Sequence, residues 1–204
     1  MGAVVAPPTA GPSEKGATVV ALIIVIVLVV LVAGLTWLAF NGIVRARNQV
    51  DNGWSQIDVQ IKRRADLIPN LVETVKGYAA HERGTLDDVV KARNAAVAAR
   101  GTPQQAAAEN ALSGTLRQLF ALAEAYPDLK ANANFQQLQS ELSDIENKIA
   151  AARRFFNNSV SEYNTGIQQF PAALFAGMFG FTQRTFFDLG DDRKAVEQAP
   201  QVKF

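Results

Sequence analysis

The side chains that most often carry catalysis or bind metals are scarce in this sequence. Cysteine is absent, and His81 is the one histidine among 204 residues. The absence of cysteine excludes disulfides, thiolate metal sites and thiol nucleophiles. His81 begins the run His-Glu-Arg-Gly-Thr, so the helical zinc motif His-Glu-x-x-His fails at its second histidine. We interpret His81 as a surface residue at a helix end, and we expect no metal and no other cofactor.

Paired carboxylates could perform acid–base chemistry, but the pairs in this chain are poorly placed for it. Asp87-Asp88 and Asp191-Asp192 are adjacent in the sequence, and adjacent residues on a helix do not face each other. Neither a Gly-x-Ser-x-Gly nucleophile motif nor a glycine-rich phosphate loop is present. The sequence therefore predicts a protein that is not an enzyme. An enzyme subunit with an unfamiliar carboxylate site is the less favoured alternative.

The charges give no reason to expect nucleic acid as a partner. The chain has 20 basic and 19 acidic residues, for a net charge of +1, whereas nucleic-acid-binding proteins concentrate basic residues on one face. The short basic cluster Lys62-Arg63-Arg64 would lie about 25 Å beyond a bilayer on a continuous helix, where attraction to anionic lipid is largely screened. We expect this cluster to be a solvated face or a contact with a partner.

One long apolar segment lies near the start of the chain. Residues 18–40 form an apolar run of 23 residues, about 34 Å long as a helix, against about 30 Å for the hydrocarbon core of a bilayer. A cleaved signal peptide is the alternative, but its apolar region would be shorter and would end in small residues rather than in Trp37 and Phe40. We predict one transmembrane helix at 18–40, after a disordered tail at 1–17.

Basic residues beside the apolar segment predict its orientation. Lys15 precedes the segment, whereas Arg45 and Arg47 follow it. Because basic residues are retained on the cytoplasmic side, we expect the N-terminus outside and the C-terminal domain in the cytoplasm. The segment has no Gly-x-x-x-Gly pattern, so the sequence offers no specific support for a homo-oligomer.

The remaining chain is patterned for helices. Apolar residues recur at intervals of three or four from Val50 to Tyr78, except at Arg64, and without a miss from Phe135 to Phe170. Such stripes are typical of long helices that bury one face, as in coiled coils. The first long helix should leave the membrane without a break. Pro69 should then kink it near Asp66.

Two shorter helices are expected between the long ones. Gly84-Thr85 offers a stop and a cap for a helix at about 86–99, and Thr102-Pro103 offers a cap for a helix that stops before Pro127. Strand patterns are nearly absent, and helices joined by short loops pack as antiparallel neighbours. The sequence therefore predicts an all-α protein. Its single transmembrane helix is followed by an antiparallel bundle of three to four helices, two of them long, over residues 43–170.

Residues 171–204 follow the bundle. They consist of a segment rich in phenylalanine and a C-terminal tail. The apolar core of this segment, at about 12 residues, is too short to cross a bilayer as a helix. Soluble monomers rarely expose an apolar patch as large as these rings would form. We favour docking of the segment on the bundle, and insertion into the membrane interface is the alternative. The candidate contacts are Phe170, Phe175, Phe179 and Phe181.

Four stretches of the chain resemble the LemA family. They are WSQIDVQIKRRADLIPNLVETVKGYAAHE at 54–82, AEAYPDLKANANFQQLQSEL at 123–142, ENKIAAARRFFNNSVSEYNTGIQQFP at 146–171 and AGMFGF at 176–181. The main departure is Phe156, where the family pattern leads us to expect Tyr. The resemblance implies a bacterial inner-membrane protein with one N-terminal helix, a short tail outside and a cytoplasmic helical bundle. The family includes a relative associated with magnetosome membranes, and it supplies no catalytic residues.

The resulting hypothesis is a membrane-anchored, non-enzymatic scaffold whose partners are the lipid bilayer and an unidentified protein. The motifs are richer in Asn and Arg than packing requires. The candidate contacts are Arg63, Arg64, Asp66, Asn70, Arg153, Arg154, Asn157 and Asn164. Mutual satisfaction of these residues within the bundle is the alternative. A membrane-organising protein that self-associates is the other candidate function, and it predicts an exposed apolar seam on the bundle.

Overall fold

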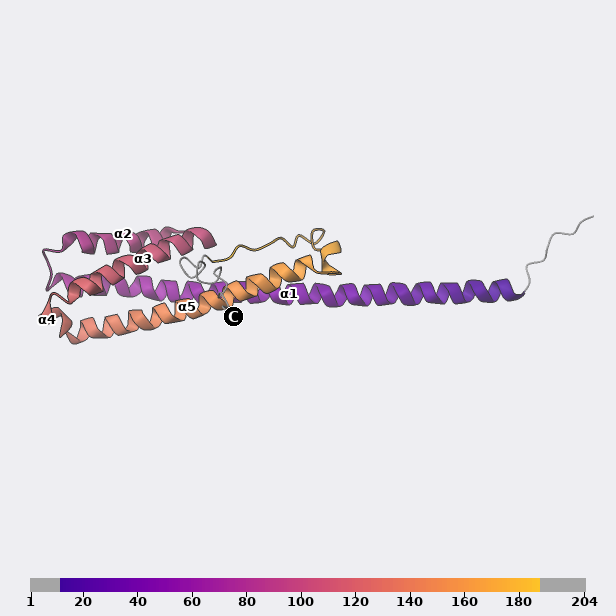
Figure 1. Cartoon of the computed structure of the whole chain (residues 1–204), viewed down its shortest axis with the longest axis horizontal. Coiled ribbons are helices and arrows are strands. Elements are labelled where there is room, and N and C mark those ends of the chain that lie inside the picture. The colour runs from indigo at the N-terminus through magenta and orange to yellow at the C-terminus, as the bar shows by residue number, and fades with distance from the viewer. Residues whose placement is uncertain (1–11, 188–204) are drawn as a thin grey trace, which may run out of the picture.

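The structure is a computed structural model that describes residues 12–187, and it is all-α, which confirms the predicted fold class. The elements in chain order are α1 (Pro12–Lys76), α2 (Arg83–Ala98), α3 (Thr102–Ala123), α4 (Pro127–Lys130), α5 (Ala133–Gln168) and the short 3-10 helix η1 (Ala172–Leu174). Residues 181–187 are extended, and the described part of the chain contains no strand. Figure 1 shows α1 projecting far beyond one end of the packed helices.

α1 joins the apolar segment to the bundle as one helix of 65 residues. Its apolar window is long enough to cross a membrane, and none of that window is buried against the rest of the protein. The window is therefore not the core helix of a soluble fold. α1 begins at Pro12 rather than at Thr18, and residues 1–11 of the expected tail lie outside the described residues.

Pro69 lies inside α1, and the helix continues past it to Lys76. A proline has no N–H to donate to the carbonyl four residues before it, which here is Ala65. The Arg93 side chain of α2 supplies the missing donor, with its Nε 3.2 Å from the Ala65 carbonyl oxygen. The neighbouring helix thus satisfies the carbonyl that the proline frees.

The helices pack in a chain of neighbours. α5 lies along α1, α2 packs on α1, and α3 packs mainly on α2, so that α3 and α5 scarcely touch. Gly53 of α1 permits the closest approach to α5, because a Cβ atom there would lie only 3.1 Å from the Cα of Phe156. The apolar stripes of α1 and α5 form the core nearer the projecting end of α1, and those of α1, α2 and α3, with Phe135 and Leu142 of α5, form the core at the far end.

Two helix starts differ from the prediction. α2 begins at Arg83, before the Gly84-Thr85 pair that was expected to cap it. Thr102 is the first residue of α3 rather than its cap, and its hydroxyl forms a 2.8 Å hydrogen bond with Thr185 instead. Thr185 lies 83 residues from Thr102, so no local capping pattern reports this bond.

The far end of the bundle is fixed by polar side chains from its loops. The Tyr126 hydroxyl donates a 3.0 Å hydrogen bond to the Glu82 carboxylate, and the Asn132 amide donates one of 2.9 Å to the Tyr78 hydroxyl. The bond to Glu82 raises the pKa of Tyr126 above its ordinary value of 10.0. These contacts tie the α1–α2 and α4–α5 connections together, beside His81, which is exposed.

Candidate functional site

A buried network of charges surrounds Arg64, the residue that interrupts the apolar stripe of α1. Arg64 is 1% exposed, and its guanidinium pairs with Glu109 of α3 and Glu146 of α5. It also donates a 2.9 Å hydrogen bond to the Ser113 hydroxyl. The Glu109 side chain is 1% exposed and that of Glu146 is 45% exposed. One side of the network is therefore closed and the other is open to solvent.

The network is extended by neutral side chains. Gln105 uses its amide to donate hydrogen bonds of 3.0 Å to Glu109 and to the Ala96 carbonyl of α2. Ser113 donates one of 3.1 Å to Glu146. Further hydrogen bonds offset the cost of burying an ion pair, and here the Arg64 Nε is left without a hydrogen-bond partner. The network consequently fixes four helices relative to one another, and its one cation and two carboxylates leave a net charge of −1.

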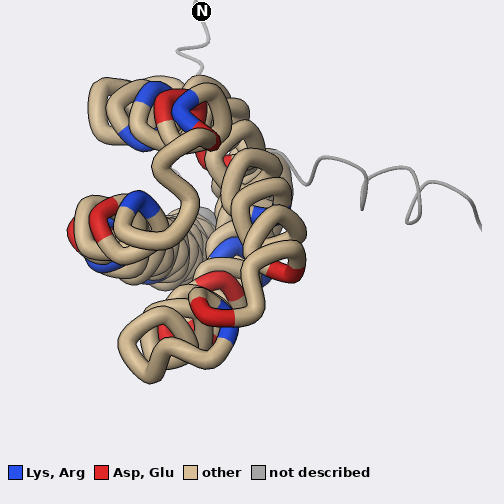
Figure 2. The backbone as a smooth tube through the Cα atoms, turned by 90° about the vertical axis from the view of Figure 1, so that its left-hand side faces the viewer, with Lys and Arg blue, Asp and Glu red and all other residues tan. Residues whose placement is uncertain are grey.

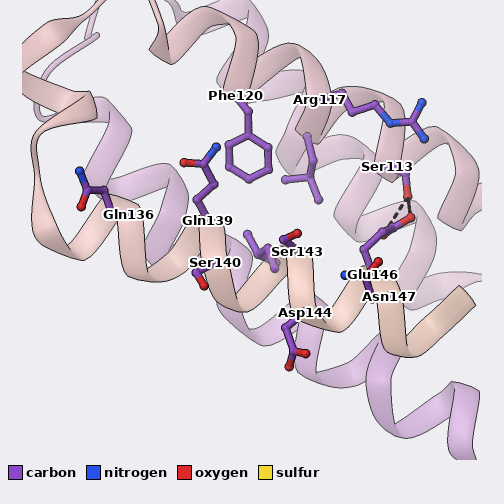
Figure 3. A pocket seen from close by; sticks show the side chains of 12 residues that line it. Ser113, Arg117, Phe120, Gln136, Gln139, Ser140, Ser143, Asp144, Glu146 and Asn147 are labelled. Atoms are coloured by element: carbon purple, nitrogen blue, oxygen red, sulfur yellow. Dashed lines mark hydrogen bonds between the residues drawn. The ribbon is translucent and has the colours of Figure 1, made fainter. Parts of the chain in front are cut away.

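A cleft of about 680 Å³ opens beside the network, between α3 and α5 (Figure 3). Figure 3 shows Phe120 of α3 and Gln139 of α5 facing each other across it, with the bonded pair Ser113 and Glu146 at one end. Amides and hydroxyls outnumber charged groups among the residues that line it, which are Ser113, Leu116, Arg117, Phe120, Gln136, Gln139, Ser140, Leu142, Ser143, Asp144, Glu146 and Asn147.

The cleft follows from a second stripe on α5, beside the apolar one. Gln136, Gln139, Ser143 and Asn147 are three or four residues apart, so they share one face of the helix. These side chains are polar and exposed, so this face of α5 offers α3 no apolar packing. Our sequence reading missed this stripe, although its spacing was visible, because polar residues at helical spacing are usually a solvated face.

Asn157 and Asn164 bind the extended segment 182–187, which we name the strap. Asn157 accepts a hydrogen bond from the Phe187 N–H and donates one to the Phe187 carbonyl, both 2.9 Å. Asn164 bonds Arg184 in the same way, at 2.8 and 2.9 Å. The two asparagines are seven residues apart on a helix, about 10.5 Å, which matches about 10 Å for three extended residues. The strap therefore runs antiparallel to α5.

Other predicted candidates lie around the strap or outside both sites. Arg153 stacks on the Phe187 ring, 4.8 Å from its centroid, and donates a 3.2 Å hydrogen bond to Asn110. Arg64, Arg153, Asn157 and Asn164 thus bond other residues of the chain, and not one another, in these contacts. Four further candidates are exposed and belong to neither arrangement, namely Arg63, Asp66, Asn70 and Arg154.

Asn157→Ala is expected to detach the end of the strap and to lower the free energy of unfolding by about 2 kcal/mol, because it leaves the buried N–H and carbonyl of Phe187 unpaired. Asn164→Ala is the matched control, since it removes the same two bonds at an exposed site and should cost about 1 kcal/mol or less. Denaturant unfolding of both variants measures the difference. Equal losses of unfolding free energy in the two variants would show that the buried hydrogen bonds of Asn157 contribute no more than the exposed ones of Asn164.

The Phe-rich segment docks on the bundle through only part of its rings. Phe175 and Phe181 are buried, whereas Phe170 and Phe179 are 79% and 57% exposed. Within residues 12–187, no three His, Cys, Asp or Glu side chains gather closely enough to hold a metal ion. A second cleft of about 680 Å³ lies beside the strap and is lined by Trp54, Phe156 and Arg184 among others; the α3–α5 cleft is the one that adjoins the buried network.

The chain is similar to proteins named LemA and to magnetosome proteins named MamQ. Residues 53–204 match the sequence model of the LemA family. The magnetosome protein MamQ of Magnetospirillum gryphiswaldense is 26% identical, with 86% of this chain and 75% of that protein aligned. Protein LemA of Metamycoplasma hominis is 28% identical over 64% of this chain and 60% of its own length. The magnetosome protein MamQ 2 of Paramagnetospirillum magneticum is 24% identical over 74% of this chain and 65% of its own length.

Proposed function

We propose, from the premise that the chain belongs to the LemA family, that it is a non-enzymatic scaffold of the bacterial inner membrane that holds a partner protein in the α3–α5 cleft. Family membership confirms the resemblance found in the sequence and supplies no activity of its own. The observation that carries the proposal is the open cleft itself. It lies on a bundle whose helices are fixed by the buried network around Arg64.

The first support for the proposal is the way α1 holds the cleft away from the bilayer. α5 has 36 residues, about 54 Å, and the cleft is formed by its first half. Figure 1 shows that this half lies at the end of the bundle opposite the projecting part of α1. We propose that α1 is the membrane anchor, and Arg45 and Arg47, which follow its apolar run, support a cytoplasmic location for the bundle.

The second support is the chemistry of the cleft, which suits a helical segment of another protein. Two helices that diverge leave a groove into which a third helix can pack. The amides and hydroxyls that line the cleft, such as Gln139 and Ser143, would form hydrogen bonds with polar side chains of the partner helix. The network has a net negative charge, and its half-exposed member Glu146 is accessible from the cleft. This charge favours a Lys or Arg on the partner. Figure 2 shows acidic and basic residues interspersed over the bundle, which supports a protein partner over nucleic acid.

Self-association is the second candidate function, and a different face supports it. Val59 of α1 and Phe155 of α5 are 48% and 44% exposed and line one groove of about 540 Å³ between these helices. Exposed apolar side chains at one place on a bundle are typical of an interface. This groove is smaller and less polar than the α3–α5 cleft, and it would bring two copies together along their long helices.

Photo-crosslinking in native membranes distinguishes the two functions. A photoreactive residue is placed at Gln139 in the cleft, at Val59 in the α1–α5 groove, or at Val97, an exposed control on α2. We expect a discrete adduct with another protein from Gln139 alone. A dimer adduct from Val59, with none from Gln139, would favour self-association. Identical adducts from all three positions would contradict a specific cleft.

A further inference from the structure

Four apolar side chains are exposed together where the chain turns out of α5 and through η1. They are Phe170, Leu174, Met178 and Phe179, with exposed fractions of 79%, 72%, 83% and 57%, and we name them the tip. No charged residue occurs from residue 163 to residue 183. Neighbouring residues of the same turn, Phe175 and Ala176, are buried. The segment is therefore anchored by one set of side chains and presents another set outward.

The tip lies at the point where the apolar surface of α1 begins. The Phe40 ring, at the end of the apolar run, packs edge-on against Phe179 with ring centroids 5.2 Å apart and against Phe181 at 5.6 Å. Trp37 and Leu38 are also exposed, at 70% and 69%. Figure 1 shows η1 beside α1, at the end of the bundle from which α1 projects. The exposed apolar surfaces of the tip and of α1 are thus continuous.

We infer that the tip inserts into the interface of the same bilayer that α1 spans, as a second membrane contact. This inference rests on the proposed membrane anchoring of α1. Four large apolar side chains would gain free energy by entering the boundary between headgroups and acyl chains, about 5–10 Å deep, whereas water disfavours such a patch. A helix alone lets the bundle rotate and tilt about its axis. A second contact beside it fixes the direction in which the α3–α5 cleft faces.

The occupant is lipid rather than a second copy of the chain, because Phe40 and the tip share one level along α1. Any protein that covered the tip would have to share that level with the headgroups beside Trp37, since tryptophan and phenylalanine at the end of an apolar span are typical of the interface. The rings of the segment differ in burial: Phe175 and Phe181 are buried, whereas Phe170 and Phe179 keep most of their surface exposed.

Quenching by lipid measures the contact in the full chain. The natural sequence has no cysteine, so Met178→Cys introduces a unique site for an environment-sensitive fluorophore, and Leu28→Cys and Gln139→Cys mark the span and the distant cleft. The protein is reconstituted in phosphatidylcholine–phosphatidylglycerol vesicles with nitroxide-labelled lipid. We expect the Met178→Cys label to be quenched to within about twofold of the Leu28→Cys label and the Gln139→Cys label to remain unquenched.

Quenching of the Leu28→Cys label alone would overturn the inference while leaving the anchor in place. Absence of quenching at both positions would overturn the anchor together with the tip, so the two failures are distinguishable. A second variant separates insertion from folding. Leu174→Asp, combined with Met178→Cys, should abolish most of the quenching without changing the melting temperature, because Leu174 is 72% exposed. Quenching that survives Leu174→Asp would also overturn the inference.

Discussion

Replacing Arg64 with Leu is expected to lower the free energy of unfolding of the bundle by about 3–5 kcal/mol, because it leaves the Glu109 carboxylate buried without a cation. Glu109 and Arg64 are each 1% exposed, so water cannot substitute for the lost partner. Glu146 is half-exposed and can be hydrated. Denaturant unfolding of the full chain in detergent measures the loss. Trp54 becomes the sole tryptophan reporter in a Trp37→Phe background, since the sequence has two tryptophans.

Arg63→Leu is the matched control, because Arg63 is adjacent and exposed and should change stability by about 0.5 kcal/mol or less. The double variant Arg64→Leu with Glu109→Leu should recover most of the loss, since apolar residues of similar volume often replace a buried ion pair without cost. Equal effects of Arg63→Leu and Arg64→Leu would contradict a buried network. Failure of the double variant to recover would place the loss in packing rather than in charge.

Phe187→Ala is expected to lower the free energy of unfolding by about 3–5 kcal/mol, the usual cost of removing a fully buried phenylalanine. Phe187 is 0% exposed. Its ring lies 6.1 Å from that of Trp54 and under the Arg153 guanidinium. The change should also shift the fluorescence emission of Trp54, because loss of the Phe187 ring exposes the indole to water.

Phe186→Ala controls for the loss of a phenylalanine from the strap, because the neighbouring Phe186 is 49% exposed and should cost about 0.5 kcal/mol. The alternating exposure of Phe186 and Phe187 reflects an extended segment, in which successive side chains point to opposite sides. A Phe187→Ala loss no larger than that of Phe186→Ala would show that the strap is not docked as described.

The helices were predictable because their signal is local. Burial of one helix face imposes a period of 3.6 residues on the sequence, and the stripe from Phe135 to Ile167 follows it. The exposed Phe170 ends that stripe, because α5 stops at Gln168. The gap at Arg64 was also visible. The role of Arg64 in the gap could not be predicted, because its partners lie 45 and 82 residues away and no local pattern pairs them.

Other features depended on pairings that no spacing encodes. The carbonyl of Ala65, which Pro69 leaves without a donor, is bonded by Arg93 of another helix. Asn157 and Asn164 looked like surface contacts for a partner, and they bind the chain's own strap instead. The cleft arises because α3 packs on α2 while α5 packs on α1, a choice of neighbours that is made by the whole bundle and not by either helix.

Co-purification from native membranes tests the central claim, that the α3–α5 cleft binds a partner protein, most directly. Ser143→Arg places a bulky side chain in the cleft. Ser161→Arg places it on the same face of α5, since 18 residues are five helical turns, about 27 Å away. We predict that Ser143→Arg reduces the recovered amount of the protein crosslinked from Gln139 by about tenfold, or about 1.4 kcal/mol, and that Ser161→Arg leaves it unchanged. Equal recovery with both variants would contradict the claim.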